Sequence, residues 1–194
     1  RGAEAVRRLG ATLFFEKPFP VEDLLTTLGR RLAGGEPGAA GPDAPPPGLP
    51  ASLDAELARQ HQARETLAEL KRRGFPMAVV TDAHNGNALT RLFRTGLAEF
   101  FDHVISYDMT GAKKPAPDAF LLALKKLGTM PSETLLVGDS LRRDIAPAQA
   151  LGMMTAYAKY GDRNVRGRDP PDCRPDIVLD GIEDLLKLMK NEED

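Results

Sequence analysis

The sequence is poor in cysteine, in long apolar runs and in net charge, and each shortage excludes a class of protein. The single cysteine, Cys173, excludes an intrachain disulfide and favours a reduced, cytoplasmic setting. No apolar run approaches the roughly 20 residues that a membrane helix needs, and no signal peptide is evident. A formal net charge of −2 over 194 residues gives no reason to expect nucleic acid or a membrane as the main partner.

Composition divides the chain at a segment that cannot form a core. Residues 34–50 are rich in Gly, Ala and Pro, and we expect an extended linker there. Before this linker, residues 11–16 are an apolar strand candidate, and residues 21–32 carry apolar side chains at helical spacing. After it, residues 51–194 hold enough apolar sequence for a hydrophobic core. We therefore predict a domain over residues 51–194 behind a short α/β fragment over residues 1–33.

Helical and strand patterns alternate through the larger domain. Helical spacing predicts helices over residues 53–73, about 87–97, 117–127, 143–151 and 182–189. Short apolar runs predict strands over residues 75–81, 103–107, 134–137, 155–160 and 176–179. Such alternation is typical of a three-layer α/β fold, in which helices cover both faces of a parallel sheet. Ligands of these sheets bind beyond the carboxyl ends of the strands.

Three polar segments follow apolar runs in an order that indicates phosphoryl chemistry. Thr81 and Asp82 end the first run, and Lys114 precedes a pair of prolines. The third run ends in a Gly-Asp-Ser turn that contains Asp139, and Asp144 lies on the next turn. Two carboxylates beside a tight turn favour a hard cation such as magnesium. A hydroxyl, a lysine and paired acids together suit a phosphate group.

This order and spacing resemble the haloacid dehalogenase superfamily of phosphohydrolases, from Leu53 to the C-terminus. The resemblance implies a Rossmann-like fold and hydrolysis of small-molecule phosphomonoesters through an aspartyl-phosphate intermediate, with Mg²⁺ as the cofactor. It makes Asp139 the principal protein ligand of the metal and Asp144 a second acid near the metal or its waters. The residues alone also allow Asp139 to cap the helix that follows it.

The same resemblance assigns the phosphate-binding groups. Lys114 would neutralise the transferred phosphate, and Lys113 is the competing neighbour. Thr81 would donate a hydrogen bond to a phosphate oxygen, together with the backbone amide of Asp82. A surface lysine ahead of a helix is the alternative interpretation of the lysine motif.

The first motif of this superfamily, Asp-x-Asp-Gly-Thr, does not occur before Thr81. It supplies the nucleophile and the general acid, and its strand occupies the middle of the sheet. Either residues 11–16 or a strand from another chain, in a homodimer or by strand exchange, would have to fill that position. If residues 11–16 fill it, Glu16 stands as a nucleophile substitute and Pro18 stands where the acid belongs. Proline cannot donate a proton, and the extra methylene of Glu misplaces its carboxylate by about an ångström.

Residues 1–33 carry a second resemblance, to the C-terminal end of a flavodoxin-like response-regulator receiver domain. Gly10 and Ala11 precede the strand candidate, and Lys17, Pro18 and Phe19 follow it. The resemblance makes Lys17 the lysine that contacts an aspartyl phosphate, whose aspartate would lie before Arg1.

Two functions are therefore expected. The first is a magnesium-dependent phosphomonoesterase that is weakened by the missing motif. The second is a non-catalytic signalling module that binds a phosphorylated ligand or partner without turnover. Lys114, Asp139 and Asp144 favour ligand and metal binding in both, whereas the missing nucleophile favours the second.

Overall fold

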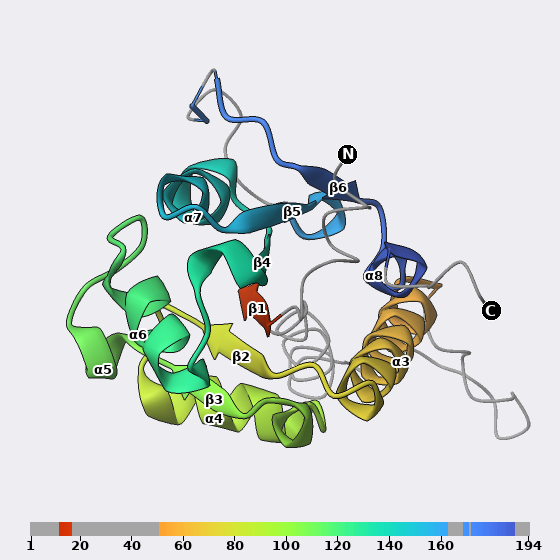
Figure 1. The fold of residues 1–194 in the computed structure, drawn as a ribbon. Helices are drawn as coiled ribbons and strands as arrows, with labels where there is room; N and C mark the ends of the chain where they lie inside the picture. The colour runs from red at the N-terminus through yellow and green to blue at the C-terminus, as the bar shows by residue number, and fades with distance from the viewer. Residues whose placement is uncertain (1–11, 17–50, 163–168, 171, 189–194) are drawn as a thin grey trace, which may run out of the picture.

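A parallel six-stranded sheet forms the centre of the protein (Figure 1). The computed structural model describes residues 12–16, 51–162, 169–170 and 172–188. The order of the strands across the sheet is β3-β2-β1-β4-β5-β6, and every neighbouring pair is parallel. The strands are β1 (Thr12–Glu16), β2 (Met77–Val80), β3 (His103–Ile105), β4 (Thr134–Gly138), β5 (Met154–Ala158) and β6 (Ile177–Leu179).

The connections between the strands are largely helical. The α-helices are α3 (Ala51–Arg72), α4 (Asn85–Arg94), α5 (Tyr107–Thr110), α6 (Asp118–Leu127), α7 (Ala146–Ala150) and α8 (Asp184–Leu188). The short turns are η1 (Ala98–Phe100), η2 (Pro131–Glu133) and η4 (Lys159–Gly161), with the π-helical turn η3 (Leu141–Ile145).

The helices and strands predicted for residues 51–194 are found with small shifts of their ends, and three details differ. Tyr107, predicted to end a strand, begins α5 instead, because its amide donates to the carbonyl of Ala83. Tyr160, also predicted in a strand, lies in η4. The helix predicted over residues 143–151 is divided into η3 and α7, since the amide of Ile145 donates to Ser140 five residues back.

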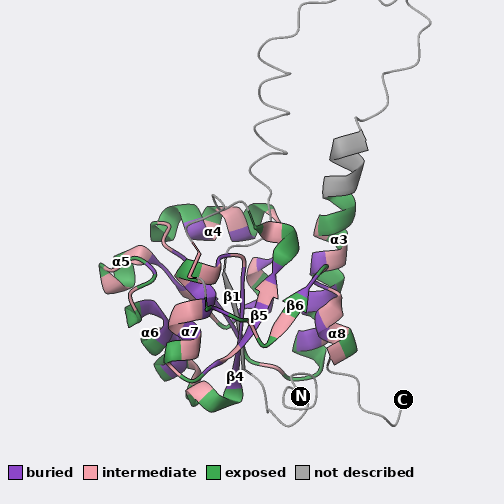
Figure 2. Cartoon of the chain, turned by 90° about the horizontal axis from the view of Figure 1, so that it is seen from above, coloured by how far each residue is buried: buried purple, intermediate pink, exposed green. Residues whose placement is uncertain are grey.

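Helices cover both faces of the sheet, and alternate residues of each strand face opposite layers. In β2, Met77 and Val79 join the core cluster that includes Leu67 of α3. Ala78 and Val80 join the cluster around Phe120 of α6. Figure 2 shows the buried residues along the inner sides of these helices. This arrangement confirms the predicted three-layer α/β fold. Among the described residues, no helix has both the length and the hydrophobicity to cross a bilayer.

The central position of the sheet is filled by β1, from the same chain. In the register of the strands, Glu16 pairs with Val80 of β2, and Phe15 pairs with both Val79 of β2 and Val137 of β4. Of the two sources predicted for a central strand, the structure therefore has the N-terminal one. Its last residue, Glu16, stands between the ends of β2 and β4.

The rest of the predicted receiver-like fragment, including Lys17, Pro18 and the helix over residues 21–32, lies outside the described residues. So does the predicted linker over residues 34–50. The resemblance to a receiver domain gains no support, because its one described piece belongs to the sheet of the larger domain.

Candidate active site

The carboxyl ends of β2, β1 and β4 lie side by side, so the segments that follow β2 and β4 meet at one edge of the sheet. Thr81 follows β2 and is 6% exposed. Its Oγ1 accepts a hydrogen bond from the amide of Ala83 at 3.2 Å. Since an amide already donates to this oxygen, the hydroxyl proton of Thr81 can be donated to an anion.

A buried ion pair lies beside this hydroxyl segment. The Nζ atom of Lys114 is 3.0 Å from Oδ1 of Asp144, and both side chains are fully excluded from solvent. Burial lowers the pKa of the Lys114 ammonium to about 8, although the charge of Asp144 opposes that shift. The competing neighbour, Lys113, is exposed, and its Nζ lies 5.3 Å from the centre of the Tyr107 ring. The structure thus brings Lys114, and not Lys113, to this edge.

The Gly-Asp-Ser turn holds Asp144 against the end of β4. The amide of Ser140 donates to Oδ2 of Asp144 at 3.0 Å, and the amide of Asp144 donates back to the Ser140 carbonyl at 2.9 Å. A Cβ atom at Gly138 would lie only 2.6 Å from Cβ of Asp144. The glycine before Asp139 is therefore required by the close approach of Asp144.

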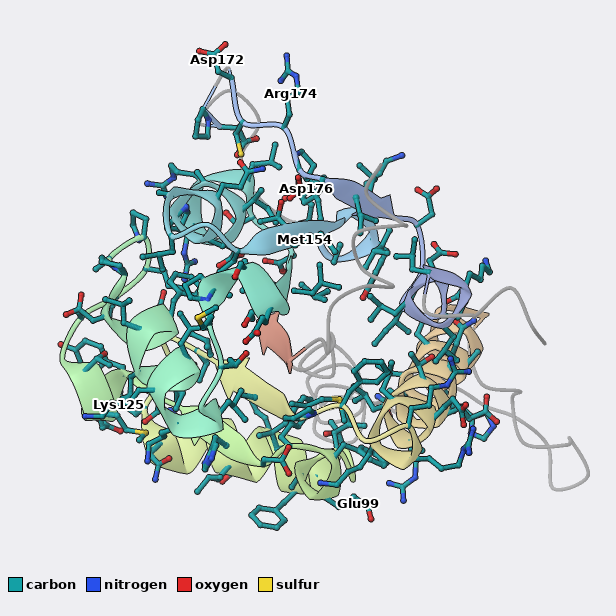
Figure 3. All side chains as sticks on the ribbon, viewed as in Figure 1. Glu99, Lys125, Met154, Asp172, Arg174 and Asp176 are labelled. Atoms are coloured by element: carbon teal, nitrogen blue, oxygen red, sulfur yellow. The ribbon has the colours of Figure 1, made fainter. Side chains whose placement is uncertain are left out.

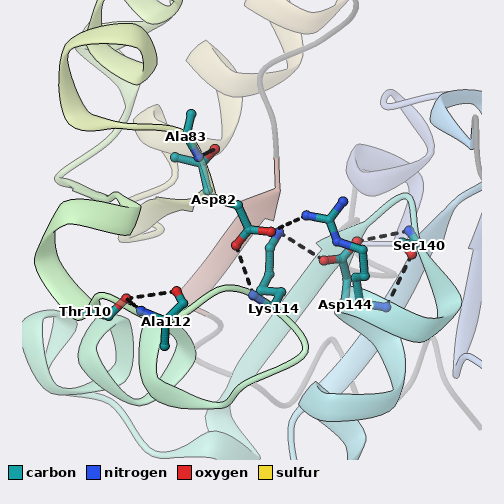
Figure 4. A network of polar contacts seen from close by, with 9 residues as sticks. Asp82, Ala83, Thr110, Ala112, Lys114, Ser140 and Asp144 are labelled. Carbon is teal, nitrogen blue, oxygen red and sulfur yellow. Dashed lines mark hydrogen bonds and ion pairs between the residues drawn. The ribbon is translucent and has the colours of Figure 1, made fainter.

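Asp82 connects the Thr81 segment to the other two (Figure 4). Its Oδ1 accepts the backbone amide of Lys114 at 3.0 Å, and its Oδ2 forms an ion pair with Arg143. The amide of Arg143 donates to Oγ of Ser140 at 3.3 Å. Sequence reasoning assigned only the backbone of Asp82 and missed Arg143. A basic residue on the turn after a strand-end acid is the signal that could have drawn attention to it.

The acids at this edge suit a magnesium ion in their chemistry. Mg²⁺ takes oxygen ligands, and one or two carboxylates with water and substrate phosphate are enough. Both oxygens of Asp144 are engaged, with Lys114 and with the Ser140 amide. The predicted role of Asp139 as the direct ligand of a metal stays a prediction. Within the described residues there is no group of three His, Cys, Asp or Glu side chains that could form a closed metal cage.

One side of this edge is formed by an exposed pair. Nδ1 of His84 lies 2.6 Å from Oδ1 of Asp108, and the amide of Asn85 donates to the other oxygen of Asp108 at 2.6 Å. These two hydrogen bonds lower the pKa of the Asp108 carboxyl, and the hydrogen bond from the Asn85 amide has the larger effect. The His84 side chain is 67% exposed.

The described part of the loop before β6 contacts the turn after β4, where Sγ of Cys173 lies 3.7 Å from the carbonyl oxygen of Leu141. Figure 3 shows Asp172 and Arg174 at its outer tip. Cys173 is 8% exposed and belongs to the core cluster on the α6 and α7 side. Burial raises the pKa of its thiol, which lowers the fraction present as the nucleophilic thiolate.

A family model described as haloacid dehalogenase-like hydrolase matches residues 51–158. The chain belongs to the haloacid dehalogenase-like hydrolases. That match covers β2 to β5 and therefore Thr81, Lys114, Asp139 and Asp144. It begins after β1, so the central strand of this haloacid dehalogenase-like domain is found by the structure alone.

Several phosphatases are similar to this haloacid dehalogenase-like chain. It is 40% identical over 130 residues to glyceraldehyde 3-phosphate phosphatase of Pyrococcus furiosus, covering 67% of this chain and 54% of that protein. It is 41% identical over 128 residues to phosphoglycolate phosphatase of Pectobacterium atrosepticum, covering 66% and 53%. The chain thus spans about half the length of the curated relatives it matches.

Solved structures share the fold. A magnesium-bound haloacid dehalogenase-like hydrolase from Bacillus subtilis superposes with a TM-score of 0.67 at 17% identity, covering 93% of this chain and 99% of that one. A phosphatase of the same superfamily from Thermococcus onnurineus gives a TM-score of 0.62 at 22% identity, covering 95% and 100%.

Proposed function

We propose that this domain binds small phosphomonoesters and hydrolyses them with the help of magnesium, at a rate reduced by its missing first motif. The observation that carries the proposal is the buried Lys114–Asp144 ion pair, at the edge where Thr81 and Asp139 also lie. Burying an ion pair costs desolvation free energy, so a buried lysine in a loop indicates a functional role. Its positive charge suits a phosphate dianion. Phosphatases among the relatives agree with this class of substrate.

The residues divide the work on the phosphate between them. Lys114 supplies a compact positive charge that Asp144 holds in place by the 3.0 Å contact. Thr81 donates its hydroxyl proton to a phosphate oxygen, because a phosphate oxygen can only accept, while Oγ1 of Thr81 also accepts the Ala83 amide. Burial of Lys114 strengthens its attraction for a dianion, since fewer waters screen the charge.

Magnesium would be held by Asp139, with the remaining positions taken by water and substrate oxygens. When bound, it would neutralise charge that develops on the transferred phosphoryl group. Asp144 contributes through Lys114 and the Ser140 turn, and its role as a second acid near the metal stays a prediction.

The nucleophile is the weak part of the site. Glu16 ends β1 between the two flanking strand ends, which is the position expected for a nucleophile substitute. Pro18, two residues further, offers no proton for the leaving group. This proline favours a second candidate function, a phosphate-binding module without turnover.

The deciding experiment compares the chain with its Asp139→Asn variant, using p-nitrophenyl phosphate with and without magnesium. The proposed hydrolase predicts slow, magnesium-dependent turnover that is lost in the variant, with an unchanged melting temperature. Asp118→Asn, on the first turn of α6, is the matched control and should retain full turnover.

Equal background rates in both proteins would contradict hydrolysis. Binding of inorganic phosphate, measured by calorimetry on the same samples, then separates the two candidates. Phosphate that binds without turnover supports the binding module. Absence of both binding and turnover rejects both functions.

A further inference from the structure

Five residues from three segments form a closed polar ring at the site, through backbone amides as well as side chains. Asp82 accepts the Lys114 amide, and the ammonium of Lys114 pairs with Asp144. Asp144 accepts the Ser140 amide, the hydroxyl of Ser140 accepts the Arg143 amide, and the guanidinium of Arg143 returns to Asp82. Figure 4 shows this polar ring. A closed ring restrains each member from two sides.

The Asp82–Arg143 contact is the link that closes the polar ring. Asp82 follows β2 and Arg143 lies in η3, which follows β4. These two strands flank β1, so the ion pair joins the segments on either side of the β1 end. This link joins the Thr81 segment to the Ser140 turn directly, beside the connection that runs through Lys114.

The environment of this ion pair differs from that of an ordinary surface pair. The side chains of Asp82 and Arg143 are 17% and 27% exposed, whereas those of Lys159 and Asp180 are 66% and 82% exposed. Partial burial reduces screening by water and salt. The carboxylate of Asp82 also has its second oxygen committed to the Lys114 amide, so moving Arg143 disturbs that hydrogen bond.

We propose that Asp82 and Arg143 are positioning residues, whose ion pair holds the backbone of Lys114 so that its ammonium is presented to phosphate beside Thr81. The statement about phosphate rests on the proposed function, whereas the statement about the Lys114 backbone does not. Arg143 acts here through Asp82, without touching the lysine amide itself.

The test is hydrogen exchange at the Lys114 amide, measured by NMR on the intact chain in Arg143→Gln. Loss of the ion pair should speed exchange of this amide about tenfold, the effect of losing one hydrogen bond. Amides within β4 serve as an internal reference and should not change. Arg142→Gln, the exposed neighbour on the same turn, is the matched control and should leave the Lys114 amide protected.

A second variant guards against a misfolded first one. Asp82→Asn keeps an oxygen for the Lys114 amide and loses the charge that holds Arg143. Asp82→Asn should also speed hydrogen exchange at the Lys114 amide. Adding Arg143→Gln to it should change the rate little further, because both substitutions remove the same ion pair. The proposal would be overturned if exchange at the Lys114 amide stayed within about twofold of the wild-type rate in both variants, because losing one hydrogen bond should change the rate more than that.

Inorganic phosphate, titrated with magnesium present, connects the polar ring to function. Arg143→Gln should weaken phosphate binding about tenfold, and Arg142→Gln should not weaken it. If the wild-type chain neither binds phosphate nor hydrolyses p-nitrophenyl phosphate, the proposed function fails. The exchange rates of the Lys114 amide still decide whether the polar ring positions Lys114.

Discussion

The flanking and central parts of the strand edge differ in how their residues are held. On the flanks, Lys114, between α5 and α6, and Asp144, in the turn after β4, are fully buried, and each is fixed by contacts with the other and with its neighbours. In the centre, the backbone register of β1 against β2 places Glu16 beside Val80. The two parts together resemble a phosphohydrolase site, but phosphate binding on the flanks needs less precise geometry than covalent attack in the centre.

Binding and bond breaking depend on these two parts separately. Electrostatic attraction falls slowly with distance, so a buried ammonium and a hydroxyl can hold a phosphate without a perfect centre. Covalent attack requires the nucleophile within a fraction of an ångström of its proper place. We therefore expect phosphate binding to be retained more fully than turnover, and the predictions below test that separation.

The largest effect should follow from Lys114→Met. This substitution leaves Asp144 buried without its partner, which costs about 3–5 kcal/mol of unfolding free energy. It also removes the positive charge for phosphate. Denaturant unfolding and phosphate calorimetry measure the two losses. Lys113→Met is the matched control, because Lys113 is exposed and its loss should change neither quantity appreciably.

The double variant Lys114→Met/Asp144→Leu separates stability from function. With both charges gone, most of the lost stability should return, since an apolar pair can replace a buried ion pair. Phosphate binding should not return. Recovery of phosphate binding in the double variant would show that Lys114 has no direct part in it.

A change at the central strand should act on turnover alone. Glu16→Asp removes the extra methylene, and a correction of about one ångström in a reacting group can change a rate about hundredfold. We expect faster hydrolysis of p-nitrophenyl phosphate in Glu16→Asp, none in Glu16→Gln, and the same phosphate affinity in all three proteins.

Glu16→Gln with wild-type turnover would rule Glu16 out as the nucleophile. A fall in phosphate affinity in Glu16→Asp would instead contradict the separation of binding from chemistry. Single-turnover kinetics beside calorimetry distinguish these results.

Two residues of the flanks, Thr81 and Asp139, could be predicted from the sequence because they follow strands directly. Thr81 and Asp139 come one residue after apolar runs, and parallel strand ends share an edge. The position of β1 was one of two alternatives, because a strand pattern does not specify which gap it fills. Arg143 was missed, since its partner Asp82 is 61 residues away and only the fold brings them together. The splitting of the predicted helix into η3 and α7 depends on the Ser140 turn, which periodicity does not encode.

The smallest effect is a pH dependence of phosphate affinity, which should arise from Lys114 on the flanks. Burial lowers the pKa of Lys114 to about 8, so the ammonium is charged below that pH and neutral above it. Phosphate affinity should therefore be full below about pH 8 and fall up to about tenfold for each pH unit above it. Calorimetry between about pH 8 and 10, where inorganic phosphate is mostly the dianion, measures this fall. Lys113→Met should show the same midpoint, because its exposed side chain takes no part in it. An affinity that stays level to about pH 10, near the ordinary pKa of lysine, would mean that the charge on Lys114 is held far more firmly than its burial implies, or that another cation binds the phosphate.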